Sequence, residues 1–261
     1  MAPNQRYPHN ARSFFTDTIR RDIGGGIVLW RGYFQSVRPA IGRILINIDT
    51  ATGVMYKPGR LIDLALEFLG RSGQPNALAP QHRFPERERM KLQHFLSGIK
   101  VTTPYSPHHR GRSRLVKKLT RLGAREQSFE VEEGETMTVA EFFRARHNIS
   151  LLYPDVICVE VCAWSPLSEL RSLSVLQLST RAQIPLELCM VPPGQIIRKQ
   201  MPPEKINSIL EFSSMRPRER FASIREGLSV RLWYYNLYLI VQQFATRYYN
   251  TVNRNTSASL V

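Results

Sequence analysis

The chain has 261 residues, of which 43% are hydrophobic and 22% are charged, which is enough apolar material for one large domain or two small ones. Lys and Arg number 36 against 21 Asp and Glu, and the formal net charge of +15 favours a polyanion or an anionic membrane surface as partner. Three cysteines are too few, and odd in number, for a disulfide-dense secreted domain, so that class of protein is excluded.

The N-terminal part of the chain predicts a turn, two strands and a helix. Residues 1–26 are polar and end in three glycines, which predict a flexible turn; no helix start and no Gly-Lys-Ser/Thr follow, so a phosphate-binding loop is disfavoured. Residues 27–34 and 44–49 are rich in β-forming side chains and are predicted strands. A helix is predicted to begin at Pro58 and to stop at Gly70. Its apolar face would carry Leu61, Leu64, Ala65, Phe68 and Leu69.

The middle of the chain changes from a loop to a basic segment. Residues 71–85 contain Gly, Pro, Ser and Asn without an apolar pattern and are predicted to form a linker. Residues 87–97 predict a short helix and residues 99–103 a strand. The side chains expected to face inward from this helix are Met90, Phe95 and Leu96. Between Lys100 and Arg125 the chain has eight Lys or Arg and no Asp or Glu, and a run of one sign favours a polyanionic partner over a solvated loop.

The C-terminal half continues with a helix, a strand and two more helices. Thr138 to Glu141 has the pattern of a capping box, so a helix is predicted from there to Arg146. Residues 156–161 predict a buried strand, and residues 195–198 a short strand after a Pro-Pro-Gly turn. Helices are predicted at 203–212 and 217–228, with Ile206, Ile209, Leu210, Phe221 and Ile224 facing inward. This order of elements is typical of an α+β fold.

The sequence lacks the signatures of an enzyme. It has no Gly-x-Ser-x-Gly, no Walker loop, no His-Glu-x-x-His and no Cys-x-x-Cys, so we predict no catalytic residue and no cofactor. Cys158 and Cys162 have a spacing that fits no zinc ligand pair well, and free or buried thiols are the better interpretation. The N-terminus predicts no signal peptide, and the apolar run at 232–241 is shorter than the roughly 20 residues that span a membrane. We therefore expect an intracellular, soluble protein without a metal or a membrane partner.

Aromatic and basic side chains gather on the helix that follows the capping box. They are Phe142, Phe143, Arg144, Arg146 and His147, with Phe129 upstream. Aromatic faces stack on bases with about 1–3 kcal/mol per base, and Arg and His donate hydrogen bonds to phosphate. Bases are accessible only when they are unpaired, so the group predicts a site for a single strand or a strand end. Of the two adjacent phenylalanines, we expect Phe143 rather than Phe142 to face the core.

Several runs of this sequence resemble the Argonaute family. Residues 12–16 resemble the exit of the N domain, and residues 24–39 and 45–57 resemble the first linker. Residues 138–143, with Arg146-His147 and Tyr153-Pro154, are similar to the helix of the PAZ domain and its exit. Residues 184–189 resemble the closing strand of that domain. The runs occur in the family's order and span most of residues 12–228.

The resemblance implies a division of the chain and a fold. Residues 1–22 would be a remnant of the N domain, 23–73 the linker 1 domain, 74–200 the PAZ domain, and 201–261 the start of linker 2 with an atypical aromatic tail. The PAZ domain is expected to be an OB-like β-barrel with an inserted αβ module, preceded by a strand–helix linker domain. Two stretches depart from the family pattern, an insertion at about 162–179 and the tail at 231–261. The MID and PIWI domains are missing, so we expect no RNA cleavage by this chain.

The resemblance also implies which residues contact RNA. A PAZ cleft takes the 3′-terminal nucleotides of a guide RNA, and Phe129 matches the aromatic residue that stacks beneath the last of them. Phe142 matches a family tyrosine that hydrogen-bonds the terminal phosphodiester. Because phenylalanine lacks the hydroxyl, Phe142 can contribute only stacking or packing. His147 matches a family His or Tyr on the same phosphate, and Arg146 matches a neighbouring basic contact. The remaining implied positions are His109, Arg112, Arg114, which falls where the family usually has Tyr, and the apolar wall residue Ile184.

Three functional interpretations follow. The leading one is a module that binds the 3′ end or 3′ overhang of a small guide RNA in RNA-mediated silencing, with silencing-complex proteins as further partners, in the cytoplasm or also the nucleus. The second is part of an RNase III-type dicing enzyme, which the linker motif at 35–39 disfavours. The third is a non-functional or regulatory truncated product, which the aromatic tail favours because exposed apolar surface invites aggregation.

Overall fold

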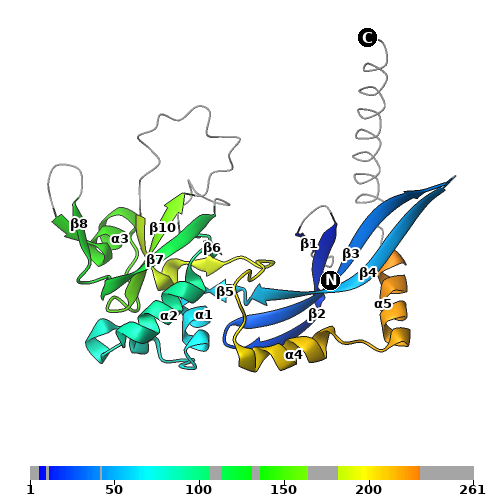
Figure 1. The fold of residues 1–261 in the computed structure, drawn as a ribbon. Helices are drawn as coiled ribbons and strands as arrows, with labels where there is room; N and C mark the ends of the chain where they lie inside the picture. The colour runs from blue at the N-terminus through cyan, green and yellow to red at the C-terminus, as the bar shows by residue number, and fades with distance from the viewer. Residues whose placement is uncertain are drawn as a thin grey trace, which may run out of the picture. The chain divides into compact units, whose positions relative to one another are not determined.

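The computed structural model describes residues 6–9, 12–41, 43–105, 113–130, 136–163 and 182–229 (Figure 1). The chain divides into two compact units. The first unit is built from the described residues of 1–22, 29–54 and 198–261, and the second from those of 23–28 and 55–197. The predicted insertion at 162–179 lies outside the described residues except for its first two positions, and the tail at 231–261 lies entirely outside them.

A four-stranded sheet forms the body of the first unit. Its order is β1 (Arg6–Pro8), β2 (Ser13–Gly24), β3 (Ile27–Ala40) and β4 (Arg43–Tyr56). The strands predicted at 27–34 and 44–49 are confirmed and are longer than expected. Strand β2 was not predicted, because only Phe15 of its residues is buried and the strand has no regular alternation of apolar and polar residues. The glycine turn at 24–26 is confirmed, since all three residues have φ between 68° and 75°, a range that favours glycine.

Two helices follow the second unit and pack on this sheet through polar contacts. They are α4 (Pro203–Ser213) and α5 (Pro217–Ser229), so both predicted helices are confirmed. Arg31 of β3 donates from Nη2 to the Phe212 carbonyl at 2.6 Å, and its guanidinium lies 4.6 Å from the centre of the Phe212 ring. The Tyr33 hydroxyl donates to the Ser223 carbonyl at 3.0 Å.

The predicted inward face of these two helices was wrong for Ile206, Leu210 and Phe221, whereas Ile209 and Ile224 are half-buried. Ile206, Leu210 and Phe221 are 44%, 57% and 60% exposed, whereas Phe212 and Ser223 are buried. The physical reason is that the sheet presents the polar side chains of Arg31 and Tyr33 to the two helices. The helix positions that become buried are therefore those that accept hydrogen bonds from these side chains or stack on the Arg31 cation.

The second unit contains a curled antiparallel sheet. Its order is β11 (Ala182–Pro185), β10 (Ile157–Ala163), β7 (Arg114–Gly123) and β6 (Lys100–Val101). A bridge between Thr102 and Met190 continues from β6 to β12 (Met190–Val191), which pairs with β5 (Gly59–Arg60). The core of the sheet is apolar, and Val116, Ile157, Val159, Val161 and Ile184 are all at most 1% exposed. The buried strand predicted at 156–161 is confirmed.

An αβ module is inserted between β7 and β10 (Figure 1). It consists of the hairpin β8 (Ser128–Glu130) and β9 (Thr136–Thr138), followed by α3 (Val139–His147). The helix predicted from the capping box is confirmed. A curled sheet with such an insertion, together with the strands and helices of the first unit, confirms the predicted α+β class.

The helices α1 (Leu61–Phe68) and α2 (Glu86–Leu96) belong to the second unit. Helix α1 begins at Leu61 and not at Pro58, because Gly59 and Arg60 pair with β12. The segment 71–85 is more ordered than a linker, since it forms the 3₁₀ turns η1 (Pro75–Leu78) and η2 (Pro80–His82) and buries Leu78 completely. The strand predicted at 99–103 is reduced to β6, and of residues 195–198 only Ile196 makes a bridge, to Met55.

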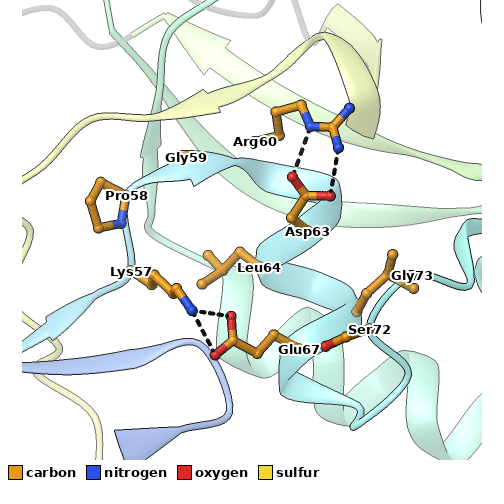
Figure 2. Close-up of a pocket in the computed structure, with 10 residues that line it drawn as sticks. Lys57, Pro58, Gly59, Arg60, Asp63, Leu64, Glu67, Ser72 and Gly73 are labelled. Atoms are coloured by element: carbon orange, nitrogen blue, oxygen red, sulfur yellow. Dashed lines mark hydrogen bonds and ion pairs between the residues drawn. The ribbon is translucent and has the colours of Figure 1, made fainter. Parts of the chain in front are cut away.

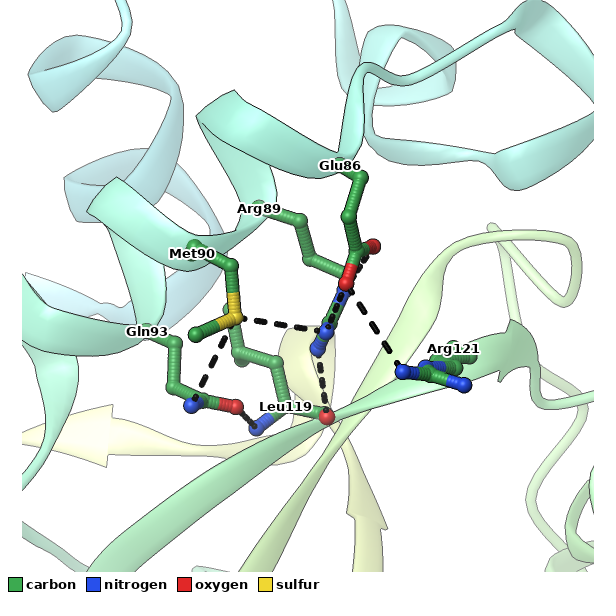
Figure 3. Close-up of polar contacts among 6 residues, drawn as sticks. All are labelled: Glu86, Arg89, Met90, Gln93, Leu119 and Arg121. Atoms are coloured by element: carbon green, nitrogen blue, oxygen red, sulfur yellow. Dashed lines mark hydrogen bonds and ion pairs between the residues drawn. The ribbon is translucent and has the colours of Figure 1, made fainter.

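Side chains of helix α2 form hydrogen bonds with the backbone of β7 at an edge that no strand covers (Figure 3). The short β6 pairs only with Leu115 and Arg114 of β7, so the backbone of Leu119 has no strand on that side. Arg89 donates from Nη1 to the Leu119 carbonyl at 3.1 Å, and the side-chain oxygen Oε1 of Gln93 accepts from the Leu119 N–H at 3.1 Å. Arg89 is 7% exposed and is held by Glu86 at 2.6 and 2.7 Å. Met90, predicted to face inward, is 47% exposed, so that prediction was wrong and Arg89 takes the buried position.

Replacing Arg89 with alanine is expected to lower the free energy of unfolding by about 2 kcal/mol, because the buried Leu119 carbonyl loses a charged donor. Chemical denaturation monitored by circular dichroism measures this change. Arg87→Ala is the matched control, since Arg87 is exposed on the same helix and its loss should change stability by less than about 0.5 kcal/mol. Equal stability of the two variants would contradict the role given to Arg89.

Candidate nucleic-acid interface

Helix α3 carries three of the predicted binding residues, Phe142, Arg146 and His147, and both of its ends are fixed by hydrogen bonds. The Thr138 hydroxyl accepts from the Glu141 N–H at 3.2 Å, and the Glu141 carboxylate accepts from the Thr138 N–H at 3.0 Å. These bonds from the Thr138 backbone and hydroxyl hold the pKa of Glu141 below its usual value. At the other end, Asn148 has φ 53° and the Ile149 N–H donates to the Phe143 carbonyl at 3.1 Å. The local sequence therefore determines both the start and the stop of α3.

Thr138→Ala is expected to destabilise the protein by about 1 kcal/mol, since the alanine leaves the Glu141 N–H without its cap. Thr138→Ser retains the hydroxyl and should restore most of the loss. Urea unfolding curves of the three proteins measure the difference. If the serine variant is as unstable as the alanine variant, the cap is not the cause.

Five aromatic rings meet around α3 and form what we call the aromatic cluster. Its members are Tyr105, Phe129, Phe142, Phe143 and His147. The ring of Phe142 lies 5.4 Å from Phe129, 5.7 Å from Phe143 and 5.9 Å from His147, all close to perpendicular. Tyr105 lies 5.2 Å from both Phe143 and His147. Residues from β8, from α3 and from the segment after β6 are thus brought together by the tertiary fold.

The members of the cluster differ in exposure. Phe143 is 2% exposed and Phe142 is half-buried, so the predicted division of roles between these two residues is confirmed. Phe129 and Tyr105 are also half-buried, and His147 is exposed. The cluster therefore has a buried base, formed by Phe143, and an accessible rim formed by the other four rings. An accessible aromatic rim suits the stacking of an unpaired base.

Tyr105 is the member of the cluster that the sequence did not predict. It follows a short strand and precedes residues 106–112, which lie outside the described residues. Burial raises the pKa of Tyr105 to about 12, while nearby Arg114 and a hydrogen bond with Thr103 lower it. Its phenol is therefore protonated at neutral pH and retains a proton to donate.

The remaining predicted site residues fall into four groups. Arg144 and Arg146 are exposed in the last turn of α3, where cations also interact favourably with the negative end of the helix dipole. Arg114 begins β7 and is half-buried. His109 and Arg112 lie outside the described residues. Ile184 is 1% exposed and pairs with Val159 in the sheet, so its side chain belongs to the core and its predicted contact with RNA stays a prediction.

A second concave site lies beside α1 and is less suited to a polyanion (Figure 2). It is a cavity of about 350 Å³ between α1, β5 and residues 72–73. Both of its cations are already paired with carboxylates of α1: Lys57 lies 2.9 Å from Glu67, and Arg60 contacts Asp63 at 2.8 and 3.0 Å. These ion pairs neutralise the charges of the cavity, so the aromatic cluster remains the better candidate.

The described part of the chain contains no metal site and no helix of membrane-spanning character. Among the described residues, no three His, Cys, Asp or Glu side chains are grouped so as to hold a metal ion. Cys158, Cys162 and Cys189 are free thiols, and burial raises the pKa of Cys158 to about 12. No helix within the described ranges is long and apolar enough to cross a membrane.

Comparisons with known proteins identify two domains in this chain. The family model of the Argonaute linker 1 domain matches residues 11–57, and that of the PAZ domain matches residues 75–210. Protein argonaute 1D of Oryza sativa subsp. japonica is 27% identical over 84% of this chain, and protein argonaute 1A of the same plant is 26% identical over 94%. The chain spans 19% and 21% of these relatives, about a fifth of their length.

One solved structure supports the fold over nearly the whole chain. The crystal structure of Kluyveromyces polysporus Argonaute with a guide RNA matches 90% of this chain and 26% of its own, with a TM-score of 0.55 and 18% sequence identity. At this level of identity the match concerns the fold alone. The aromatic cluster lies within the region that the PAZ model matches.

Proposed function

We propose that this chain, which belongs to the Argonaute family through its linker 1 and PAZ domains, binds the 3′ end of a small single-stranded guide RNA. The observation that carries the proposal is the aromatic cluster, whose accessible rings lie beside Arg144, Arg146 and His147 at the end of α3. A base can stack on the rings while its phosphate accepts hydrogen bonds from the cations. The Argonaute of Kluyveromyces polysporus, whose fold this chain shares, was crystallised with a guide RNA.

Tyr105 supplies a group that Phe142 lacks. A phenylalanine at position 142 cannot donate a hydrogen bond to the terminal phosphodiester, whereas the protonated phenol of Tyr105 can. Its ring lies 5.2 Å from that of His147, so the two side chains can reach one phosphate. We therefore assign phosphate binding to Tyr105 and His147, and base stacking to Phe129 and Phe142.

The two alternatives are weaker. The match to the Argonaute linker 1 domain disfavours a dicing enzyme, and the domains that match are linker 1 and PAZ, so no RNA cleavage is assigned to this chain. A non-functional product would lack a cooperative structure. A single sharp thermal transition of soluble protein would reject that alternative, whereas aggregation without a transition would support it.

Fluorescence anisotropy tests the proposed function. A labelled duplex with a two-nucleotide 3′ overhang is compared with the blunt duplex and with a 5′-overhang duplex, at several salt concentrations. We expect tighter binding of the 3′ overhang and a modest salt dependence, with a slope of about −0.7 per phosphate neutralised on a single strand. Equal binding of the three duplexes with a steep salt dependence would show only a basic surface and would overturn the proposal.

A further inference from the structure

We propose that Glu187 is a positioning residue, whose carboxylate holds the loop at 148–153 against the barrel and thereby fixes the end of α3 that carries His147. This proposal rests on the proposed function, because it concerns the same site. It assigns a role in 3′-end binding to a residue that lies on the barrel, outside the aromatic cluster.

Glu187 binds the backbone of the loop directly. Its carboxylate accepts from the Leu152 N–H at 3.1 Å and from the Tyr153 N–H at 3.4 Å. Glu187 lies on the 3₁₀ turn η5 (Leu186–Leu188), between the fully buried Leu186 and Cys189, so its own backbone is part of the barrel core. A rigid turn therefore presents two acceptor oxygens to two consecutive N–H groups of a loop.

The loop is the connection that holds the C-terminal end of α3. At its N-terminal end the helix is bound to the turn after β7, since the Val139 N–H donates to the Gln127 carbonyl and the Ala140 N–H to the Ala124 carbonyl, both at 2.9 Å. At its C-terminal end, the Ile149 N–H donates to the Phe143 carbonyl. Three residues later, the Leu152 N–H donates to the Glu187 carboxylate of the barrel. His147 is only five residues before Leu152, so a displacement of the loop moves the exposed ring of the cluster.

The environment of Glu187 indicates that the loop amides, and not an ion pair, are its partners. Burial raises the pKa of the carboxyl, whereas the N–H groups of Tyr153 and Leu152 and the charge of Arg60 lower it. Arg60 is already bound to both oxygens of Asp63, at 2.8 and 3.0 Å. The hydrogen bonds of Glu187 are therefore directed at the loop, and a shorter or uncharged side chain would bind the amides less well.

Glu187→Gln tests the proposal with two measurements. Hydrogen exchange followed by mass spectrometry is expected to be faster in residues 144–153 and unchanged in α2. The preference for the 3′-overhang duplex over the blunt duplex, taken as the ratio of the two dissociation constants, should fall about threefold to tenfold. A ratio is used because the removal of a negative charge strengthens the binding of both duplexes. Glu187→Asp, which keeps the charge, is the second variant if the glutamine variant does not fold.

The control is Glu126→Gln, which removes the same charge from an exposed side chain bound to Gln81. This variant should change neither the ratio nor the exchange of residues 144–153. Unchanged exchange in Glu187→Gln would overturn the proposal, as would faster exchange with an unchanged ratio or faster exchange throughout the protein. If the wild-type protein shows no overhang preference, the proposed function fails, and exchange in residues 144–149 alone decides whether Glu187 positions α3.

Discussion

Replacing Phe129 with alanine is expected to weaken binding of the 3′-overhang RNA duplex about tenfold, since the stacking of one base on one ring is lost. Phe129 is half-buried on β8, and its ring lies 5.4 Å from that of Phe142, so it forms the accessible side of the aromatic cluster. His147→Ala should reduce binding by a similar factor through the loss of a phosphate contact. Fluorescence anisotropy with overhang and blunt duplexes measures both effects, and binding of the blunt duplex should remain nearly constant.

Phe221→Ala is the matched control for this experiment. Phe221 is 60% exposed on α5 of the first unit, and its replacement removes the same ring from a surface outside the cluster. We expect an unchanged overhang preference for this variant. If Phe129→Ala keeps the preference, or if Phe221→Ala loses it to the same degree, the aromatic cluster is not the site of 3′-end binding.

The second large effect is expected for Gly123→Ala, which should destabilise the second unit by about 3 kcal/mol or more. A Cβ atom at this position would lie 2.3 Å from the Asp155 carbonyl oxygen and 2.6 Å from its carbon. These are backbone atoms and cannot rotate away. Gly123 also precedes the turn that binds the first N–H groups of α3, so the strain would reach the candidate site.

Gly70→Ala separates this clash from ordinary backbone strain. Gly70 has φ 69°, and an added Cβ would meet no atom within 4 Å, so only the left-handed conformation costs energy, about 1–2 kcal/mol. Thermal and urea unfolding of the two variants give the comparison. A Gly123→Ala protein as stable as the Gly70→Ala protein would show that β7 and the segment at Asp155 can move apart.

The parts of this protein that the sequence predicted well are those determined by neighbouring residues. Helix α3 was predicted because Thr138 and Glu141 cap each other three residues apart, and this pattern is complete within a single turn. The buried strand β10 was predicted because Val156, Ile157, Val159 and Val161 are all β-branched and apolar. The Argonaute resemblance also came from contiguous runs of residues, and the linker 1 and PAZ matches confirm it.

The assembly of the site was decided by tertiary structure. Tyr105 joins the aromatic cluster across almost 40 positions from Phe143, and no local pattern signals such a contact. Met90 was predicted to face inward, yet Arg89 is the buried residue, because β6 is too short to cover the carbonyl of Leu119. Leu210 and Phe221 were assigned to the core by helical spacing. The sheet, however, contacts their helices through Arg31 and Tyr33, which donate hydrogen bonds to helix backbone carbonyls, so these two side chains stay exposed.

The sequence by itself therefore determined the family, the α+β class and the helix α3 with its aromatic and basic side chains, because local capping, side-chain pattern and contiguous motifs carry that information. Only the tertiary structure decided which aromatic rings meet, which charges are buried and how the loop after α3 is held by Glu187. Hydrogen bonds and ring contacts between distant residues depend on where the barrel brings the chain together, and spacing along the sequence does not specify that geometry.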